Sequence, residues 1–253
     1  ILFAGPLVAR SGKVVMSPPG GDVIGRRRVD THFLALQELG VNISANGQFV
    51  FSTNKLVGAD IFLDEASVTA TENAVMAAVL ADGQTIIPNA ASEPHVQDLC
   101  KMLISMGAKI SGVGSNILTI DGVKKLHGTE YRIGPDYMEI GSFIGLAAAT
   151  KGSITITGVE PRDLRPIKLA FKKLGIHWEL DGDSLTVPMG QSMQVDTDLG
   201  GMTPKIDDSP WPGFPADLTS VMTVVATQVS GTVLIFEKMF ESRMFFVDKL
   251  IGM

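Results

Sequence analysis

A repeated arrangement of helices and strands, with a period of about 70 residues, constrains the fold of this 253-residue chain more than any other feature. Four segments each combine a helix of small apolar residues, a turn and an alternating β run. These segments are 1–16, 74–88, 143–159 and 221–237, and their expected turn glycines are Gly12, Gly83, Gly152 and Gly231. Such internal similarity indicates that one supersecondary unit is used several times.

A second pattern recurs between these segments. Short amphipathic helices end at glycines that can adopt the left-handed conformation of a helix cap. They are 33–40, 99–107 and 169–175, ending at Gly40, Gly107 and Gly175. Each is followed by two β runs joined by hairpin turn residues. The predicted pairs are 41–44 with 49–52, 108–111 with 117–120, and 176–180 with 184–187.

The repeating unit is therefore helix, strand, helix, strand, strand, which predicts an α/β (α+β) fold with mixed sheets packed against helices. The fourth copy stops in residues 247–253, where the pattern requires a capping glycine and a hairpin. We therefore expect the chain to lack its natural C-terminus, and a preceding repeat as well.

Composition excludes several classes of protein. With 45% hydrophobic residues the chain can bury a large core, whereas its net charge of −6 argues against a general nucleic-acid binder. Its apolar runs are too short to span a membrane, so no membrane partner is expected. The lone Cys100 excludes an internal disulfide, favours the cytoplasm, and is interpreted as a buried, inert thiol. Four His and one Cys without ligand spacing predict neither a metal nor a cofactor.

One stretch combines backbone freedom with opposite charges. Gly20-Gly21-Asp22 is followed closely by Arg26, Arg27 and Arg28. Glycines let the backbone approach a ligand, and guanidinium groups suit phosphate or carboxylate. The charge pattern alone leaves two interpretations open: a loop that binds an anionic substrate, or a solvated turn before a charged helix start.

Ordered motifs throughout the chain resemble the enolpyruvyl transferase superfamily, and within it the branch that uses UDP-N-acetylglucosamine. The motifs include Gly5-Pro6-Leu7-Val8-Ala9-Arg10, Pro19-Gly20-Gly21, Thr71-Glu72-Asn73, Glu93-Pro94, Pro135-Asp136, Phe214-Pro215-Ala216-Asp217 and Glu241-Ser242-Arg243. The resemblance implies a two-domain inside-out α/β barrel of repeated βαβαββ units. The first domain would be 1–135, lacking its first repeat and carrying the active-site loop 18–30, and the second would be 136–253, incomplete at its C-terminus.

The resemblance also implies a reaction. The enolpyruvyl group of phosphoenolpyruvate would move to the 3′-hydroxyl of UDP-N-acetylglucosamine with release of phosphate, as the first committed step of peptidoglycan synthesis. These two small molecules are the expected partners, and a cytoplasmic monomer is favoured. Two alternatives stay open: a shikimate-pathway enolpyruvyl transferase, and a non-catalytic homologue or inactive fragment on the same scaffold.

The reaction needs a proton donor for C3 of the enol, a base for the hydroxyl, and cations around carboxylate and phosphate. By resemblance, Asp22 stands where most members carry a loop cysteine, and it would be the acid. Asp217 matches the candidate base, although it equally suits the N-cap of a helix over 218–229. Arg10 and Arg27 would bind phosphoenolpyruvate through bidentate contacts.

Other residues match regions that the superfamily uses around the UDP-sugar. Asp30, Ser67 and Arg243 are the candidates there. A lone histidine at a helix start is more often a surface or capping residue, which is our interpretation of His32. Glu93 and Asp136 are interpreted as structural caps or charge partners.

The chain departs from the superfamily pattern at three positions, Arg28, Glu65 and Tyr137. Arg28 replaces a usual proline and Tyr137 a frequent arginine. Glu65 replaces a frequent lysine, and a carboxylate there would repel a diphosphate. The superfamily's N-terminal Lys-Asn pair and its late C-terminal arginine have no counterpart in the sequence. We therefore expect the chain alone to be inactive if those residues are indispensable.

Overall fold

The computed structural model describes residues 1–21 and 29–253. Contacts divide these residues into two compact units, with the division between Ile133 and Gly134. Unit 1 comprises residues 1–21 and 29–133, and unit 2 comprises 134–253. Their assignment to the two predicted domains stays a prediction. In the described ranges, every helix falls short of the length or hydropathy that a membrane crossing requires.

Unit 1 contains two copies of the predicted repeat. The first is α1 (Ala4–Ser11), β1 (Lys13–Met16), α2 (Asp30–Glu38), β2 (Asn42–Asn46) and β3 (Gln48–Ser52). The second is α3 (Val68–Ala78), β4 (Gln84–Pro88), α4 (Pro94–Ser105), β5 (Lys109–Ser111) and β6 (Ile117–Asp121). Both copies follow the order helix, strand, helix, strand, strand, as the sequence predicts.

Unit 2 begins with a third copy and continues into the start of a fourth. The third is α5 (Tyr137–Ala149), β7 (Ile154–Thr157), α6 (Arg165–Lys173), β8 (Glu179–Asp181) and β9 (Ser184–Val187). Next come the 3₁₀ turn η1 (Leu199–Gly201) and β10 (Lys205–Asp207). The fourth is the 3₁₀ turn η2 (Ala216–Leu218), α7 (Thr219–Ala226), β11 (Leu234–Phe236), the 3₁₀ turn η3 (Arg243–Phe246) and α8 (Val247–Ile251).

Each complete repeat forms a three-stranded sheet whose last strand lies in the middle, in the orders β1-β3-β2, β4-β6-β5 and β7-β9-β8. The pairings within these sheets are antiparallel. Parallel contacts come from elsewhere: β10 pairs with β11, and the segment 57–61 runs beside β4. There Ile61 N–H donates to Ile86 O at 2.8 Å, so the arrangement is mixed as expected.

The glycines that end the short helices have positive φ angles, as predicted: 87° at Gly40, 98° at Gly107 and 71° at Gly175. One predicted turn position is wrong. In the third repeat the left-handed residue is Lys151, with φ of 55°, and not Gly152. The chain reverses one residue earlier because Gly152 N–H donates to Ala147 O at 2.9 Å and closes the end of α5.

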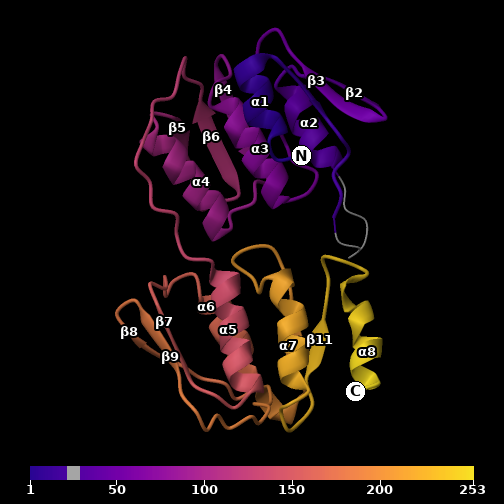
Figure 1. Ribbon diagram of the computed structural model, residues 1–253, viewed down its shortest axis with the longest axis vertical. Helices are drawn as coiled ribbons and strands as arrows, with labels where there is room; N and C mark the ends of the chain where they lie inside the picture. The colour runs from indigo at the N-terminus through magenta and orange to yellow at the C-terminus, as the bar shows by residue number, and fades with distance from the viewer. Residues whose placement is uncertain (22–28) are drawn as a thin grey trace. The chain divides into compact units, whose positions relative to one another are not determined.

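Small residues let the helices of each unit pack closely. Figure 1 shows α1 beside α3 in unit 1, and α5 beside α7 in unit 2. A Cβ on Gly5 of α1 would lie 2.3 Å from the Asn73 carbonyl oxygen, and one on Gly145 of α5 would lie 2.5 Å from Val221 Cγ1. Such distances are shorter than any real contact, so only glycine fits. This close approach brings polar side chains of neighbouring helices within hydrogen-bonding distance.

Candidate functional site

The predicted site residues are divided between the two units. Arg10 lies in the last turn of α1 and Asp30 begins α2, and both are exposed. Ser67 occupies the N-cap position of α3 and is half-buried. Asp217 and Arg243 belong to unit 2. The other two predicted residues, Asp22 on the loop and Arg27, lie outside the described residues.

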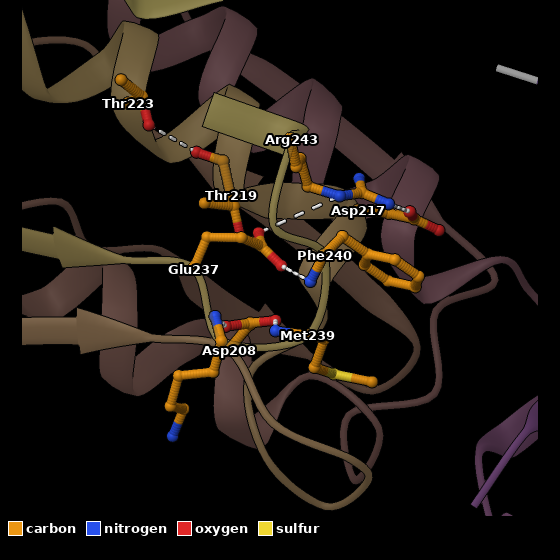
Figure 2. Close-up of polar contacts among 9 residues, drawn as sticks. Asp208, Asp217, Thr219, Thr223, Glu237, Met239, Phe240 and Arg243 are labelled. Carbon is orange, nitrogen blue, oxygen red and sulfur yellow. Dashed lines mark hydrogen bonds and ion pairs between the residues drawn. The ribbon is translucent and has the colours of Figure 1, made fainter. Parts of the chain in front are cut away.

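The structure brings Asp217 and Arg243 together (Figure 2). Arg243 Nη2 donates to Asp217 Oδ1 at 2.8 Å, and the two side chains are 11% and 61% exposed. Asp217 lies in η2, and α7 begins only at Thr219, with no side-chain cap. The N-cap interpretation of Asp217 is therefore wrong. A tight 3₁₀ turn before α7 leaves its carboxylate on the surface, where it pairs with the arginine.

Glu237 lies beside Arg243, just after β11 (Figure 2). Its Oε1 accepts a hydrogen bond from Phe240 N–H at 3.1 Å. Its Oε2 lies 3.9 Å from Arg243 Nε, and the Glu237 side chain is only 3% exposed. The Arg243 guanidinium also lies over the Phe240 ring, 4.9 Å from its centroid. Arg243 is thus held by a buried carboxyl group, an aromatic face and the exposed Asp217.

A second buried carboxyl group, Asp208, lies beside Glu237. It accepts hydrogen bonds from Lys238 N–H at 2.6 Å and Met239 N–H at 3.2 Å. Burial, and next the neighbouring Asp208 carboxyl group, raise the pKa of Glu237 to about 7. Because the negative charge of Asp208 disfavours a second charge beside it, Glu237 is partly protonated near neutral pH.

Unit 1 contains a different polar cluster, centred on Asn73 of α3. Its Oδ1 accepts a hydrogen bond from Gly5 N–H at 2.5 Å. Its Nδ2 lies 3.0 Å from Ile1 O and 3.0 Å from His32 Nδ1. The His32 Nε2 is 3.1 Å from Thr69 Oγ1. Asn73 therefore links α1, α2 and α3 through one side chain.

This cluster fixes the tautomer of His32. A backbone N–H can only donate, so the Asn73 oxygen must face Gly5 and the Asn73 amide nitrogen must donate to His32 Nδ1. The histidine proton is then on Nε2 and points to Thr69. Burial, and next the amino group of Ile1, lower the pKa of His32 to about 4. His32 is 3% exposed, so its interpretation as a surface or capping residue is wrong.

Ser67 and its neighbours shape the start of α3. Ser67 Oγ accepts from Ala70 N–H at 3.4 Å, while Thr71 Oγ1 donates to Ser67 O at 2.8 Å. The same Thr71 oxygen accepts from Ala91 N–H at 2.9 Å. Capping accounts for these contacts of Ser67, and its place near a UDP-sugar stays a prediction.

Three further carboxyl groups have clear structural surroundings. Asp136 accepts from Met138 N–H at 2.9 Å and Glu139 N–H at 3.1 Å, so its predicted role as a cap, here of α5, is confirmed. Glu93 occupies the N-cap position of α4 without a side-chain capping bond. Burial, and next the negative charge of Glu93, raise the pKa of Glu72 to about 7.

Cys100 and the departures from the superfamily pattern also have structural explanations. Cys100 is 1% exposed, and burial followed by the charge of Glu72 raises its pKa to about 11, which confirms the buried, inert thiol. Tyr137 is buried and packs edge-on against Trp211, with ring centroids 5.5 Å apart. Glu65 is exposed, and Arg28 lies outside the described residues.

Sequence reasoning missed the buried roles of Asn73, Glu237 and Asp208. One signal was present: Thr71-Glu72-Asn73 places three polar residues inside a helix of small apolar ones. Glu237 and Asp208 carried no comparable signal, because each simply follows a short β run. Across the ranges that the structure describes, no three or more His, Cys, Asp or Glu side chains are grouped as metal ligands would be.

Comparisons with known proteins bear on the whole chain. The family model of EPSP synthase (3-phosphoshikimate 1-carboxyvinyltransferase) matches residues 1–253. UDP-N-acetylglucosamine 1-carboxyvinyltransferase of Treponema denticola is 76% identical over 253 residues, which are 100% of this chain and 59% of the relative. The protein of that name from Treponema pallidum is 66% identical, covering 100% of this chain and 60% of the relative.

Solved structures agree on the fold. The enolpyruvyl transferase NikO from Streptomyces tendae superimposes with a TM-score of 0.80 at 20% identity, covering 99% of this chain and 59% of that one. EPSP synthase from Acinetobacter baumannii gives a TM-score of 0.60 at 17% identity, covering 92% and 53%. The chain thus has the α/β fold of these proteins and spans 59% or 60% of the length of its Treponema relatives.

Proposed function

The chain belongs to the EPSP synthase family, and from that premise we propose that it carries out enolpyruvyl transfer from phosphoenolpyruvate to the 3′-hydroxyl of UDP-N-acetylglucosamine. The observation that carries the proposal is the 76% identity, over all 253 residues, to a UDP-N-acetylglucosamine 1-carboxyvinyltransferase. In this proposal the protein is a transferase of peptidoglycan synthesis that acts as a monomer in the cytoplasm.

In unit 2, Asp217 is the proposed base for the sugar hydroxyl. Its side chain is 61% exposed, so a reactant can approach it, and Arg243 Nη2 holds one of its oxygens at 2.8 Å. A carboxylate held by a charge-assisted hydrogen bond keeps a defined orientation. Arg243 is also the unit 2 candidate for contact with the UDP-sugar.

In unit 1, Arg10 is a proposed contact for phosphoenolpyruvate, and Asp30 and Ser67 are proposed contacts for the UDP-sugar. Arg10 and Asp30 are exposed, as ligand contacts require. The proposed proton donor Asp22 and the proposed phosphoenolpyruvate ligand Arg27 rest on the sequence resemblance alone.

The decisive experiment is an assay of phosphate release. It uses a chimera in which this chain replaces the matching 59% of the Treponema denticola relative. The rest of the chimera comes from that relative. The chimera is assayed with phosphoenolpyruvate and UDP-N-acetylglucosamine beside the unaltered relative and the chain alone. Phosphate release by the chimera, with formation of the enolpyruvyl sugar nucleotide, is the expected result.

Two other results would contradict the proposal. If the chimera accepts shikimate 3-phosphate and not the UDP-sugar, the substrate assignment is wrong and the shikimate-pathway alternative holds. If it binds UDP-N-acetylglucosamine in calorimetry but releases no phosphate, the non-catalytic alternative holds. Asp22→Asn in the active chimera should abolish turnover and preserve UDP-sugar binding, with Asp181→Asn on an exposed hairpin as the control.

The aspartate on the loop also predicts resistance to an antibiotic. By resemblance, the epoxide fosfomycin alkylates the cysteine that most members carry at the position of Asp22. A carboxylic acid there is a far weaker nucleophile than a thiolate. The chimera should keep its activity after incubation with fosfomycin, while Asp22→Cys should lose activity with time. A mass adduct on the loop of the unsubstituted chimera would overturn this prediction.

A further inference from the structure

Two buried polar atoms in unit 2 face each other without completing a hydrogen bond. Glu237 Oε2 and Arg243 Nε are 3.9 Å apart. Among the described residues, neither atom has a hydrogen-bond partner. A separation of 3.9 Å is too long for a hydrogen bond and leaves an electrostatic contact. An acceptor and a donor of opposite charge are thus about one ångström farther apart than in a hydrogen bond.

The Glu237 side of this contact is fixed. Phe240 N–H holds its other oxygen at 3.1 Å, and Asp208 beside it is itself anchored by two backbone N–H groups. The Arg243 side is constrained by the Phe240 ring and by the hydrogen bond to Asp217. A shift of the guanidinium toward Glu237 would therefore move its Nη2 and the Asp217 carboxylate attached to it (Figure 2).

We propose that Glu237 is a positioning residue: acting through Arg243, it sets the orientation of the Asp217 carboxylate. This inference rests on the proposed function, in which Asp217 is the base. Glu237 does not touch a reactant, because its side chain is 3% exposed and lies beside the arginine. Its effect on the reaction passes entirely through the Arg243 guanidinium.

Stability does not explain this arrangement. Burying a carboxyl group without completing its hydrogen bonds costs free energy, and an apolar side chain of similar size would often be more stable. The neighbours of Glu237 also work against its charge, because Asp208 faces it and burial raises its pKa to about 7. The group is therefore better explained by what it does to Arg243.

Several elements contribute the groups around Glu237. Asp208 follows β10, Thr219 begins α7, and Phe240 and Arg243 belong to the segment that follows β11. Asp207, the last residue of β10, forms ion pairs with Lys205 at 2.9 Å and with Lys238 at 2.7 Å. Arg243 contacts both Glu237 and Asp217 and so connects the buried carboxyl group to the exposed one.

A double-mutant cycle tests the proposal in the active chimera. Glu237→Ala should lower kcat about 10-fold, because a small misplacement of a reacting group costs that much or more. The KM for UDP-N-acetylglucosamine should change less than about 2-fold, and Glu237→Gln, which keeps the shape and the bond from Phe240, should recover most of kcat. In an Asp217→Asn background, Glu237→Ala should have no further effect, since both changes act on one carboxylate.

Additive effects of the two substitutions on kcat would overturn the proposal, as would a raised KM at unchanged kcat. Glu179→Gln, at an exposed carboxylate on β8, is the matched control and should leave both constants unchanged. Thermal unfolding of every variant identifies a loss of kcat that comes from loss of folding. If Glu237→Ala does not fold, the NMR signal of Arg243 in the Glu237→Gln variant carries the test.

A second measurement does not depend on turnover. The Nε–H group of Arg243 gives its own NMR signal when arginine is labelled with ¹⁵N, and Glu237→Gln should shift that signal and change its rate of hydrogen exchange. Glu179→Gln should leave it unchanged. A wild-type chimera without turnover would overturn the proposed function, whereas an Arg243 signal insensitive to Glu237 would overturn this inference whether or not turnover is seen.

Discussion

The two units each contain a polar cluster among apolar helices, and the clusters differ in how completely they are paired. In unit 1, Asn73 uses its carbonyl oxygen and its amide group in contacts with Gly5, Ile1 and His32. In unit 2, Glu237 and Arg243 leave two buried atoms 3.9 Å apart. A fully paired cluster fixes one geometry, whereas an incompletely paired one leaves its members able to shift. The first therefore suits a structural role and the second a catalytic one.

The largest effect should come from the exposed end of the unit 2 cluster. Asp217→Asn should lower kcat of the active chimera by about 10²- to 10⁴-fold, because a general base contributes that much. Its free energy of unfolding should change by less than about 1 kcal/mol, since the ion pair with Arg243 is largely solvated on the aspartate side. Steady-state kinetics and urea unfolding check the two parts. If Asp217→Asn instead lowers stability and leaves kcat nearly unchanged, the unit 2 cluster has a structural role and the comparison between the clusters is wrong.

The centre of the unit 1 cluster should show the opposite behaviour. Asn73→Leu leaves Gly5 N–H and His32 Nδ1 buried without their partner, and each such group costs about 1–3 kcal/mol. We expect unfolding in urea to become easier by about 3 kcal/mol in total. Asn73→Asp sharpens the test, because it keeps the acceptor for Gly5 but cannot donate to His32. If both variants unfold like the wild type, the cluster has no structural role.

The pH dependence of stability should have opposite signs in the two clusters. The pKa of His32 is about 4 in the fold against 6.5 for an ordinary histidine, so its neutral form is favoured. Its stabilisation is complete above pH 6.5 and is lost as the pH falls toward 4. The pKa of Glu237 is raised from 4.5 to about 7, so its stabilisation is present below pH 4.5 and is lost as the pH rises to about 7.

Shifts of this size at fully buried groups correspond to about 3 kcal/mol, and solvent screening lowers each contribution to about 2 kcal/mol. Urea unfolding from pH 4 to 8 would measure them. His32→Gln should reduce the loss of unfolding free energy as the pH falls toward 4. Glu237→Gln should reduce the loss of unfolding free energy as the pH rises toward 7. The pKa of Glu72 is also raised to about 7, so Glu72 should lose its stabilisation over the same pH range as Glu237. Glu72→Gln is therefore the control that separates the contribution of unit 1 from that of unit 2. A Glu237→Gln profile identical to the wild type would contradict the raised pKa.

The smallest effects should come from the helix caps. Asp136 accepts two short backbone hydrogen bonds in unit 2, whereas Ser67 accepts one of 3.4 Å in unit 1. Asp136→Ala should therefore cost about 1 kcal/mol of unfolding free energy, and Ser67→Ala about half of that. Neither loss alone indicates a catalytic role. A larger cost for Ser67→Ala would mean that this residue has contacts beyond its cap.

Local features of the fold could be predicted from the sequence. The order of elements, the hairpins and the glycines at Gly40, Gly107 and Gly175 depend on residues close together in the chain, where periodicity and turn chemistry are informative. Even local patterns failed where two neighbours compete, since Lys151 and not Gly152 adopts the left-handed conformation. The alternative interpretation of Asp217 as a helix cap is wrong because a 3₁₀ turn precedes α7, and such a turn leaves no trace in the sequence.

The polar clusters could not be predicted in the same way. Asn73 meets partners 41, 68 and 72 residues away, and no local pattern reports on such contacts. Asp208 directly follows β10 and Glu237 directly follows β11, so their proximity depends on the parallel pairing of these two strands. The resemblance did predict that Asp217 and Arg243 are important, but it assigned them to separate roles and not to one ion pair.

The burial of Cys100 has a practical consequence. A thiol that is 1% exposed, with a pKa of about 11, is protected from maleimide reagents at neutral pH. A cysteine introduced at an exposed hairpin tip, such as Asn46 in unit 1 or Asp183 in unit 2, would then be labelled selectively. Donor and acceptor dyes on these two tips would report the separation of the units by energy transfer, before and after each substrate is added. The chain therefore already has the chemically silent background that such fluorescence work requires.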